Sequence, residues 1–276
     1  MEGCSFRREL VDAKRIVVKV GTSTLTYENG KINFSKIDKL SRVLSDLMNQ
    51  GKELVLVTSG AVGIGMSKLK LKSKPQTTRE KQAVAAVGQC ELMHVYGKFF
   101  SEYGHLVGQI LLTKDVTTNE ISRQNVINTL ETLIEKDILP IVNENDSVAV
   151  DELENGINRA FGDNDTLSAI VAELVKADLL IILSDIDGLY TCDPRKNSCS
   201  ELISVVEEIT PEIEGCAGGV GSRRGTGGMI TKITAAKMAV SNGINLVIAN
   251  GEEPSIISDI LEGKNVGTLF VRKKQA

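Results

Sequence analysis

The sequence predicts an α/β protein built from βαβ units around a mainly parallel sheet. Two observations support this: short runs rich in β-branched residues alternate with longer amphipathic runs, and small, polar or acidic residues follow most of the strand-like runs. The chain has 276 residues, enough for one large domain with a substantial core, and no composition break marks a linker. We therefore expect one domain with two lobes that meet near Phe161.

In the first half of the chain, strands are expected where β-branched residues cluster, and helices where apolar residues recur every three or four positions. Ser35 and Asp38 form a capping signal for the first long helix, with Phe34 placed to pack at its entry, and Gly51 follows its last turn. The expected strands are 15–20, 53–58, 105–113 and 138–142, and the expected helices are about 35–50, 78–103 and 119–136.

The second half continues the alternation after residues 147–160, whose mixture of β-formers and turn residues indicates a hairpin. Asp165 stands at the start of the next predicted helix, and another helix begins at Met229, directly after a glycine-rich segment. Residues 191–228 are polar and less regular. The expected strands are 179–183, 245–248 and 267–271, and the expected helices start near 165 and cover 229–242 and 254–261.

Composition argues against several classes of function. The net charge is −4, Trp is absent and aromatic residues make up 4%, which disfavours phosphate-driven or base-stacking nucleic-acid binding. The five cysteines form no CxxC pair, so neither a zinc site nor a disulfide framework is indicated. No apolar run is long enough to span a bilayer and no signal peptide is recognisable, so a cytoplasmic location is expected.

Five predicted strands end in turns that suit a bound ligand. They are followed by GTST, SGAVGIG, NENDS, SDIDG and ANG, which begin at Gly21, Ser59, Asn143, Ser184 and Ala249. In open α/β sheets, ligands bind beyond the carboxyl ends of the strands, and glycine lets a ligand approach the backbone closely. Five such turns at one edge predict a ligand-binding crevice there.

Two lysines are candidates for binding an anion in this crevice. Lys19 lies near the end of the apolar run RIVVKV, and Lys232 lies in the first turn of a predicted helix, at the end of GTGGMITK. Glycine-rich backbone, a helix N-terminus and a lysine together favour a phosphate site. The alternatives are the polar face of an edge strand for Lys19 and a solvated loop lysine for Lys232. Neither a Walker A loop nor G-x-G-x-x-G at a strand–helix turn is present.

Acidic residues occur in three close pairs, Glu144 with Asp146, Asp163 with Asp165, and Asp185 with Asp187. Such pairs hold divalent metals, act as acid and base, or bind a ligand ammonium group. They also cap helices and form turns, and Asp165 is placed to cap the helix that follows it. A crevice that combines lysines with carboxylates favours phosphoryl transfer.

Six segments occur in the order VVKVGTSTLT, VTSGAVGIG, VNENDSV, FGDNDTLSA, LSDIDGLYT and GTGGMITK. Together they resemble the amino-acid kinase family, and within it most closely the glutamate 5-kinases (γ-glutamyl kinases), from Lys14 to about Arg272. The resemblance implies a three-layer α/β/α sandwich with a mainly parallel central sheet. It implies phosphorylation of the γ-carboxylate of L-glutamate by ATP with Mg²⁺, which gives L-glutamyl 5-phosphate in the first step of proline biosynthesis.

The resemblance also implies roles for individual residues. Lys19 and Lys232 would contact the transferring phosphate, and Asp165 would orient both lysines. The substrate site would contain Ser59, Gly60, Asp146, Asp163 and Asn164. The ATP site would contain Lys19, Gly21, Thr22, Ser184, Asp185, Thr226, Gly227, Gly228, Met229, Ile230, Thr231 and Lys232. No metal ligand is assigned to a protein side chain.

Further expectations follow from the same resemblance. Residues 15–160 would form the substrate-binding lobe and residues 161–276 the ATP-binding lobe, with no PUA domain of the kind many bacterial members carry. Proline would inhibit, glutamyl phosphate reductase would be the pathway partner, and the chain would form a dimer or tetramer. The competing readings are a kinase of the same fold for acetylglutamate, aspartate, carbamate or a nucleoside monophosphate, a non-catalytic amino-acid sensor, and a nucleic-acid-binding module.

Overall fold

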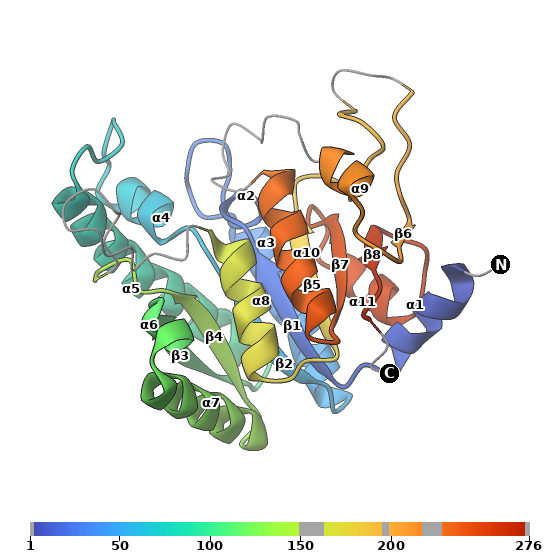
Figure 1. Ribbon diagram of the computed structural model, residues 1–276. Coiled ribbons are helices and arrows are strands. Elements are labelled where there is room, and N and C mark those ends of the chain that lie inside the picture. The colour runs from blue at the N-terminus through green and yellow to red at the C-terminus, as the bar shows by residue number, and fades with distance from the viewer. Residues whose placement is uncertain (1–2, 149–162, 195–198, 217–227, 274–276) are drawn as a thin grey trace.

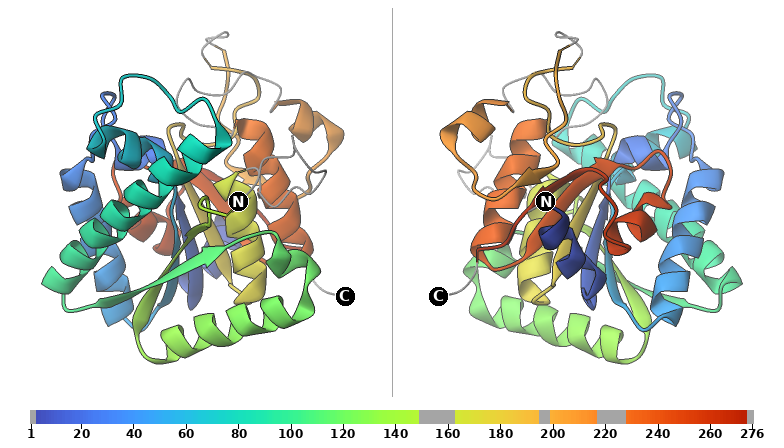
Figure 2. Two further views of the ribbon diagram at one scale, coloured as in Figure 1. Left: turned by 90° about the vertical axis from the view of Figure 1, so that its left-hand side faces the viewer. Right: turned by 90° about the vertical axis from the view of Figure 1, so that its right-hand side faces the viewer.

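The computed structural model describes residues 3–148, 163–194, 199–216 and 228–273. Within these ranges, helices cover both faces of an eight-stranded sheet, as the views in Figure 1 and Figure 2 show. Neighbouring strands run parallel, except for one antiparallel pair between β7 and β8. The prediction of an α/β protein with helices on both sides of a mainly parallel sheet is therefore confirmed.

The strands and helices alternate along the chain. The described strands are β1 (Arg15–Val20), β2 (Glu53–Val57), β3 (Leu106–Leu112), β4 (Ile138–Glu144), β5 (Leu179–Ser184), β6 (Val205–Val206), β7 (Asn245–Asn250) and β8 (Thr268–Phe270). The described helices are α1 (Gly3–Val11), α2 (Thr22–Leu25), α3 (Phe34–Asn49), α4 (Ala61–Lys68), α5 (Thr78–Glu102), α6 (Asp115–Thr118), α7 (Glu120–Glu135), α8 (Asn164–Leu174), α9 (Pro211–Cys216), α10 (Met229–Ser241) and α11 (Ile256–Leu261).

The strand order is β3-β4-β2-β1-β5-β7-β8-β6, which places β1 near the centre of the sheet. The chain adds β2, β3 and β4 on one side of β1 and then β5 and the later strands on the other side. Such a change of direction opens a crevice at the carboxyl ends of the strands. Lys19 lies at this end of β1, level with Val57 on one neighbour and Ile182 on the other.

Two hydrophobic cores, one on each face of the sheet, hold the three layers together. Alternate residues of a strand point to opposite faces, so Val17 packs with α7, α8 and α10 while Ile16 and Val18 pack with α3, α5 and α11. Both faces of the central strands are buried, which explains the nearly continuous apolar runs in the sequence.

Helices α4 and α5 pack unusually closely because two glycines face each other's backbone. A Cβ atom added at Gly88 would overlap the carbonyl oxygen of Ala61, and one added at Gly65 would overlap the carbonyl oxygen of Val84. Only glycine fits at such a crossing. The close packing fixes the start of α4, which follows Gly60 at the carboxyl end of β2.

Some local predictions were wrong or incomplete. Asn33 caps α3 by accepting a hydrogen bond from Lys36 N, so the predicted Ser35–Asp38 cap does not form. Helices α1, α2, α4 and α6 were not predicted, and of these α2, α4 and α6 are too short to show a clear period. The stretch 191–228 contains the short elements β6 and α9. The hairpin expected at 147–160 and the lobe boundary near Phe161 lie outside the residues that the structure describes. None of the described helices is long and apolar enough to cross a membrane.

The close approach of α4 and α5 predicts different effects for two glycine substitutions on one helix. Gly88→Ala forces a methyl group onto the α4 backbone and should lower the free energy of unfolding by about 1–3 kcal/mol. Gly97→Ala is the control, because its Cβ would come no closer than 4.0 Å to another side chain. It should be neutral or stabilise by up to about 1 kcal/mol through helix propensity. Urea unfolding compares the two, and equal effects would contradict this packing.

Candidate active site

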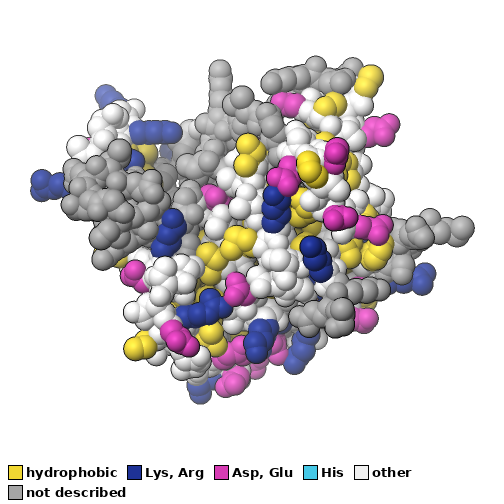
Figure 3. Space-filling view, viewed as in Figure 1, with side chains coloured by type: hydrophobic (Ala, Val, Ile, Leu, Met, Phe, Trp, Pro, Cys, Tyr) yellow, Lys and Arg dark blue, Asp and Glu magenta, His cyan; other side chains and the backbone are white. Residues whose placement is uncertain are grey.

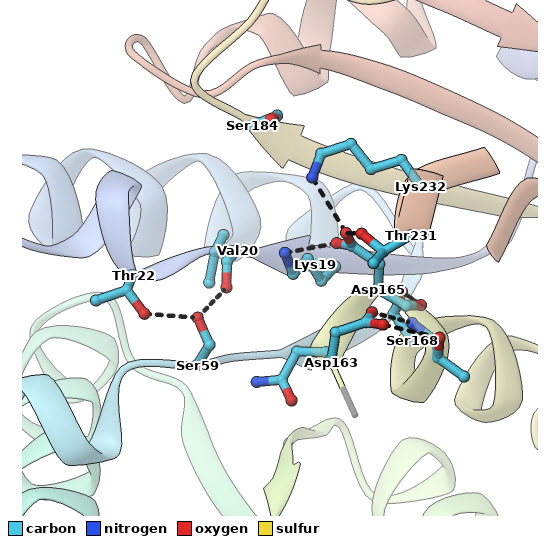
Figure 4. Close-up of polar contacts among 12 residues, drawn as sticks. Lys19, Val20, Thr22, Ser59, Asp163, Asp165, Ser168, Ser184, Thr231 and Lys232 are labelled. Carbon is cyan, nitrogen blue, oxygen red and sulfur yellow. Dashed lines mark hydrogen bonds and ion pairs between the residues drawn. The ribbon is translucent and has the colours of Figure 1, made fainter. Parts of the chain in front are cut away.

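Two lysines from distant parts of the chain share one buried carboxylate. Lys19 Nζ lies 2.6 Å from Asp165 Oδ1, and Lys232 Nζ lies 3.1 Å from Asp165 Oδ2 (Figure 4). The exposed fractions of these residues are 8% for Lys19, 6% for Lys232 and 2% for Asp165. The alternatives of an edge strand for Lys19 and of a solvated loop lysine for Lys232 are therefore wrong.

Three elements bring these side chains together. Lys19 comes from the end of the central strand β1, Asp165 from the first turn of α8 and Lys232 from the first turn of α10. Helices α8 and α10 lie side by side on the same face of the sheet (Figure 1), with both first turns at the edge where β1 ends. The site therefore requires the sheet and both helices to be assembled.

The two cations determine the charge of Asp165. Burial alone raises the pKa of a carboxyl group, but the attraction of Lys19 and Lys232 and hydrogen bonds from Lys19 and Thr231 lower the pKa of Asp165 to about 2. Thr231 Oγ1 donates to Asp165 Oδ2 at 2.8 Å. Asp165 is therefore ionised at neutral pH, and two ammonium groups with one carboxylate leave a net positive charge in a poorly hydrated place.

The backbone around this charge is open to an incoming anion. Gly21 follows β1, and a Cβ atom there would lie 3.6 Å from Lys19 Nζ, at ordinary van der Waals distance, so this glycine lies directly beside the ammonium group. Helix α10 begins after Gly228 and helix α4 after Gly60, and neither cap residue makes a side-chain hydrogen bond to the first turn. Helix N-termini of this kind attract anions.

Ser59 and Thr22 border the site beside Lys19. The two hydroxyl oxygens lie 3.3 Å apart, and Ser59 Oγ also donates to the carbonyl oxygen of Val20 at 3.2 Å (Figure 4). Gly60 has φ 93°, in the left-handed region that favours glycine, and a Cβ atom there would lie 3.3 Å from the Thr22 side chain. The predicted residues Gly21, Thr22, Ser59 and Gly60 are thus neighbours at this edge.

Asn164 and Asp163 lie on the β2–β4 side of the centre. Asn164 Nδ2 donates to the carbonyl oxygen of Thr58 at 2.6 Å and to Asn143 Oδ1 at 3.0 Å. Asp163 caps α8, because its carboxylate accepts from Thr166 N at 2.8 Å and from Thr166 Oγ1 at 3.2 Å. The capping role considered for Asp165 belongs to Asp163 instead, which leaves the Asp165 carboxylate to the lysines.

The remaining predicted residues are more scattered. Asp146 is half-buried in the turn after β4. Ser184 is buried at the end of β5 and its hydroxyl donates to Asp185 Oδ1 at 3.2 Å, while Met229 and the exposed Ile230 begin α10. Thr226 and Gly227 lie outside the described part of the chain. Among the described residues, no group of three or more His, Cys, Asp or Glu side chains could hold a metal ion.

Two residues of this site were not predicted from the sequence. Asn143 opens the NENDS segment but was read only as part of a turn, whereas its amide contacts Asn164 and Gln89. Gln89 lies within a long helix, where nothing in the sequence distinguishes it from its neighbours. Only the packing of α5 against β4 brings it to the site.

The surface around the site carries charges of both signs. In the view of Figure 3, Lys and Arg side chains are interspersed with Asp and Glu over the described part of this face. The positive charge of Lys19 and Lys232 is, in contrast, buried. Buried lysines suit a small anion that reaches them at the end of β1 better than a long polyanion that lies across the surface.

Comparison with known sequences identifies close relatives over the whole described site. A model of the amino acid kinase family matches residues 14–250. A glutamate 5-kinase from Clostridium perfringens (strain 13 / Type A) is 65% identical over 269 residues, which cover 98% of this chain and 99% of the relative. A glutamate 5-kinase from Listeria innocua is 57% identical over 270 residues, which cover 98% of this chain and 97% of the relative. The resemblance noted from the motifs is thereby confirmed.

Solved structures support the same fold at much lower identity. An isopentenyl phosphate kinase superposes with a TM-score of 0.66 at 15% identity, over 93% of this chain and 100% of that chain. A carbamate kinase from Giardia lamblia bound to AMP-PNP superposes with a TM-score of 0.66 at 16% identity, over 95% of this chain and 100% of that chain. At this level of identity, these similarities show the fold and not the substrate.

The low pKa of Asp165 predicts a pH-dependent contribution to stability. The folded pKa of about 2 lies below the ordinary value of 3.8, so the contribution is full above about pH 4 and is lost as pH falls through 2. Its size at pH 7 is on the order of 2 kcal/mol. Urea unfolding of the original chain and of Asp165→Asn should give a difference in the free energy of unfolding that shrinks by about 1 kcal/mol between pH 7 and pH 3. A difference independent of pH would contradict the pairing with the lysines.

Proposed function

This chain belongs to the amino acid kinase family, and we propose that it phosphorylates the γ-carboxylate of L-glutamate with ATP. The observation that carries the proposal is the pair of buried lysines on Asp165 at the switch point of the sheet. The product would be L-glutamyl 5-phosphate, an acyl phosphate. Relatives that are 57–65% identical and named glutamate 5-kinase support this choice of acceptor.

The proposed mechanism needs no general base. The γ-carboxylate of glutamate is ionised at neutral pH and can attack the terminal phosphorus atom of ATP directly, while the bond from that atom to the β–γ bridging oxygen breaks and ADP leaves. Catalysis then consists of alignment and of stabilising the charge on the phosphoryl group in transfer. Lys19 and Lys232 would supply this charge from two sides, while Asp165 keeps their ammonium groups converging on one point.

The nucleotide would bind on the α10 and β5 side. Gly21, Thr22, Ser184 and Asp185 would border it, together with Thr226, Gly227, Gly228, Met229, Ile230, Thr231 and Lys232. The backbone N–H groups at the start of α10 suit phosphate oxygens. Mg²⁺, when bound, would neutralise part of the charge of the nucleotide phosphates. It would arrive with ATP and be held mainly by phosphate oxygens and water, a common mode for this ion.

Glutamate would bind on the β2–β4 side, in a lobe formed by residues 15–160, and ATP in a lobe formed by residues 161–276. Ser59 and the N–H groups after Gly60 would bind carboxylate oxygens. Asp146 and Asn164 would bind the α-ammonium group. Asp163 is placed on this side too, where it also fixes the first turn of α8.

We further propose inhibition by proline at a site that overlaps the glutamate site, since both ligands carry an amino group beside a carboxylate. We also propose that the chain forms a homodimer or homotetramer. Glutamyl phosphate reductase would consume the acyl phosphate in the following step. Millimolar proline should lower the rate and raise the apparent KM for glutamate. An unchanged rate would reject the inhibition without affecting the proposed reaction.

The direct test is ATP turnover with Mg²⁺ and L-glutamate, with hydroxylamine present to trap the acyl phosphate as a hydroxamate. L-Aspartate, acetylglutamate, carbamate and UMP run in parallel. Glutamate-dependent hydroxamate and ADP would establish the reaction. Turnover on another acceptor alone would retain the kinase and reject glutamate, and binding of glutamate without any turnover would indicate a sensor.

The proposed role of Lys232 predicts that two lysine substitutions in α10 will have very different effects on kcat. Lys232→Ala should lower kcat for hydroxamate formation by about 100-fold or more, because a preorganised cation at the phosphoryl group is lost. Lys237→Ala is the matched control, since Lys237 lies on the same helix and pairs with Glu214 at the surface. It should keep kcat within about twofold. Normal kcat in Lys232→Ala would contradict the assigned role.

A further inference from the structure

Gln89 is a buried amide on α5 to which no role has been assigned above. Its Oε1 accepts a hydrogen bond from Asn143 Nδ2 at 2.8 Å, across the contact between α5 and β4. The exposed fractions are 8% for Gln89 and 2% for Asn143. Buried amides are costly unless they are hydrogen-bonded, so this pair calls for an explanation beyond simple packing.

The hydrogen bonds between these amides run in one direction. The carbonyl oxygen of Thr58 can only accept, so Asn164 must turn Nδ2 toward it. The same Nδ2 donates to Asn143 Oδ1, which leaves Asn143 Nδ2 to donate to Gln89 Oε1. Every amide orientation follows from this sequence of donors and acceptors. Asn164 Oδ1 then remains without a donor among the described residues.

Helix α5 supports this arrangement at a second point. Tyr96, two turns after Gln89, is fully buried, and its hydroxyl lies 2.9 Å from Thr58 Oγ1. Thr58 directly precedes Ser59, and its backbone oxygen is the acceptor for Asn164. The face of α5 that carries Gln89 and Tyr96 therefore contacts both ends of the amide chain, at β4 and at β2.

The nitrogen atom of the Gln89 amide also bears on why glutamine occupies this position. Gln89 Nε2 is buried and has no hydrogen-bond partner among the described residues. A buried donor without a partner destabilises the fold, so stability alone does not favour glutamine at this position. Its Oε1 is the atom that makes a contact, and that contact orients Asn143.

We propose that Gln89 is a positioning residue for the amino-acid substrate. By accepting from Asn143, it fixes Asn143 and, through it, Asn164, so that Asn164 directs Oδ1 toward the α-ammonium group of glutamate. Without Gln89 Oε1, Asn143 can turn its amide over and present Nδ2 to Asn164 Nδ2, which repels Asn164 from its place. The inference rests on the proposed function and concerns its substrate side alone.

Gln89→Met tests the proposal, because methionine has nearly the same length and lacks the acceptor. The substitution leaves Asn143 Nδ2 without an acceptor but removes the unpartnered Nε2, so the thermal midpoint should change by only a few degrees. The KM for L-glutamate should rise about tenfold. The KM for ATP should stay within about twofold, since Lys19 and Lys232 pair with Asp165 and, in the part of the chain that the structure describes, make no hydrogen bond to these amides.

Two further variants separate positioning from a merely structural role. Gln89→Glu keeps an oxygen toward Asn143 and should give a lower KM for glutamate than Gln89→Met. Gln124→Met is the matched control, since Gln124 donates to Asn128 at 2.8 Å between exposed side chains of α7. It should leave both KM values unchanged.

The original chain is assayed first. If it shows no glutamate-dependent turnover, the proposed function fails and this inference fails with it. If it turns over glutamate and Gln89→Met keeps the original KM for glutamate, the inference alone is overturned. A Gln89→Met protein that does not fold, or that raises both KM values equally with a large fall in the thermal midpoint, would show a structural role and would also overturn it.

Discussion

The carboxylate of Asp165, shared by the ammonium groups of Lys19 and Lys232, is the interaction on which the architecture of the site depends. Two buried cations at one point repel each other, and each is costly to remove from water. A single buried anion between them makes the arrangement possible and still leaves a net positive charge at this point. The low pKa of Asp165 follows from the same balance.

The need to bring two lysines to one carboxylate accounts for several features of the surrounding backbone. Asp163 caps α8, which leaves Asp165, two residues further along the chain, to face the lysines. Gly21 leaves space beside Lys19, and the starts of α4 and α10 present helix N-termini without side-chain caps. On the β2–β4 side, the amide of Asn143 donates to Gln89 on α5, and Tyr96 on the same helix lies within hydrogen-bond distance of Thr58, so α5 supports this side of the site.

Much of this could be predicted from the sequence, because apolar runs mark buried parallel strands and glycines and acids mark their ends. Lys19 could be recognised because a lysine in the apolar run RIVVKV is rarely buried unless it has a partner. The structure shows that its partner is Asp165. The Asn33 cap was missed because Ser35, two residues later, offered a competing capping signal. Gln89 could not be found, since its role arises from contacts between elements 54 residues apart in the chain.

The shared role of the two lysines is tested most directly by a double-mutant cycle with Lys19→Met and Lys232→Met, in which kcat for hydroxamate formation is measured. If the two lysines act as one unit held by Asp165, loss of either leaves the other drawn onto the carboxylate. The fall in kcat of the double variant should then be far smaller than the product of the two single falls. Losses that multiply would show that the lysines act independently and would contradict the central role of Asp165.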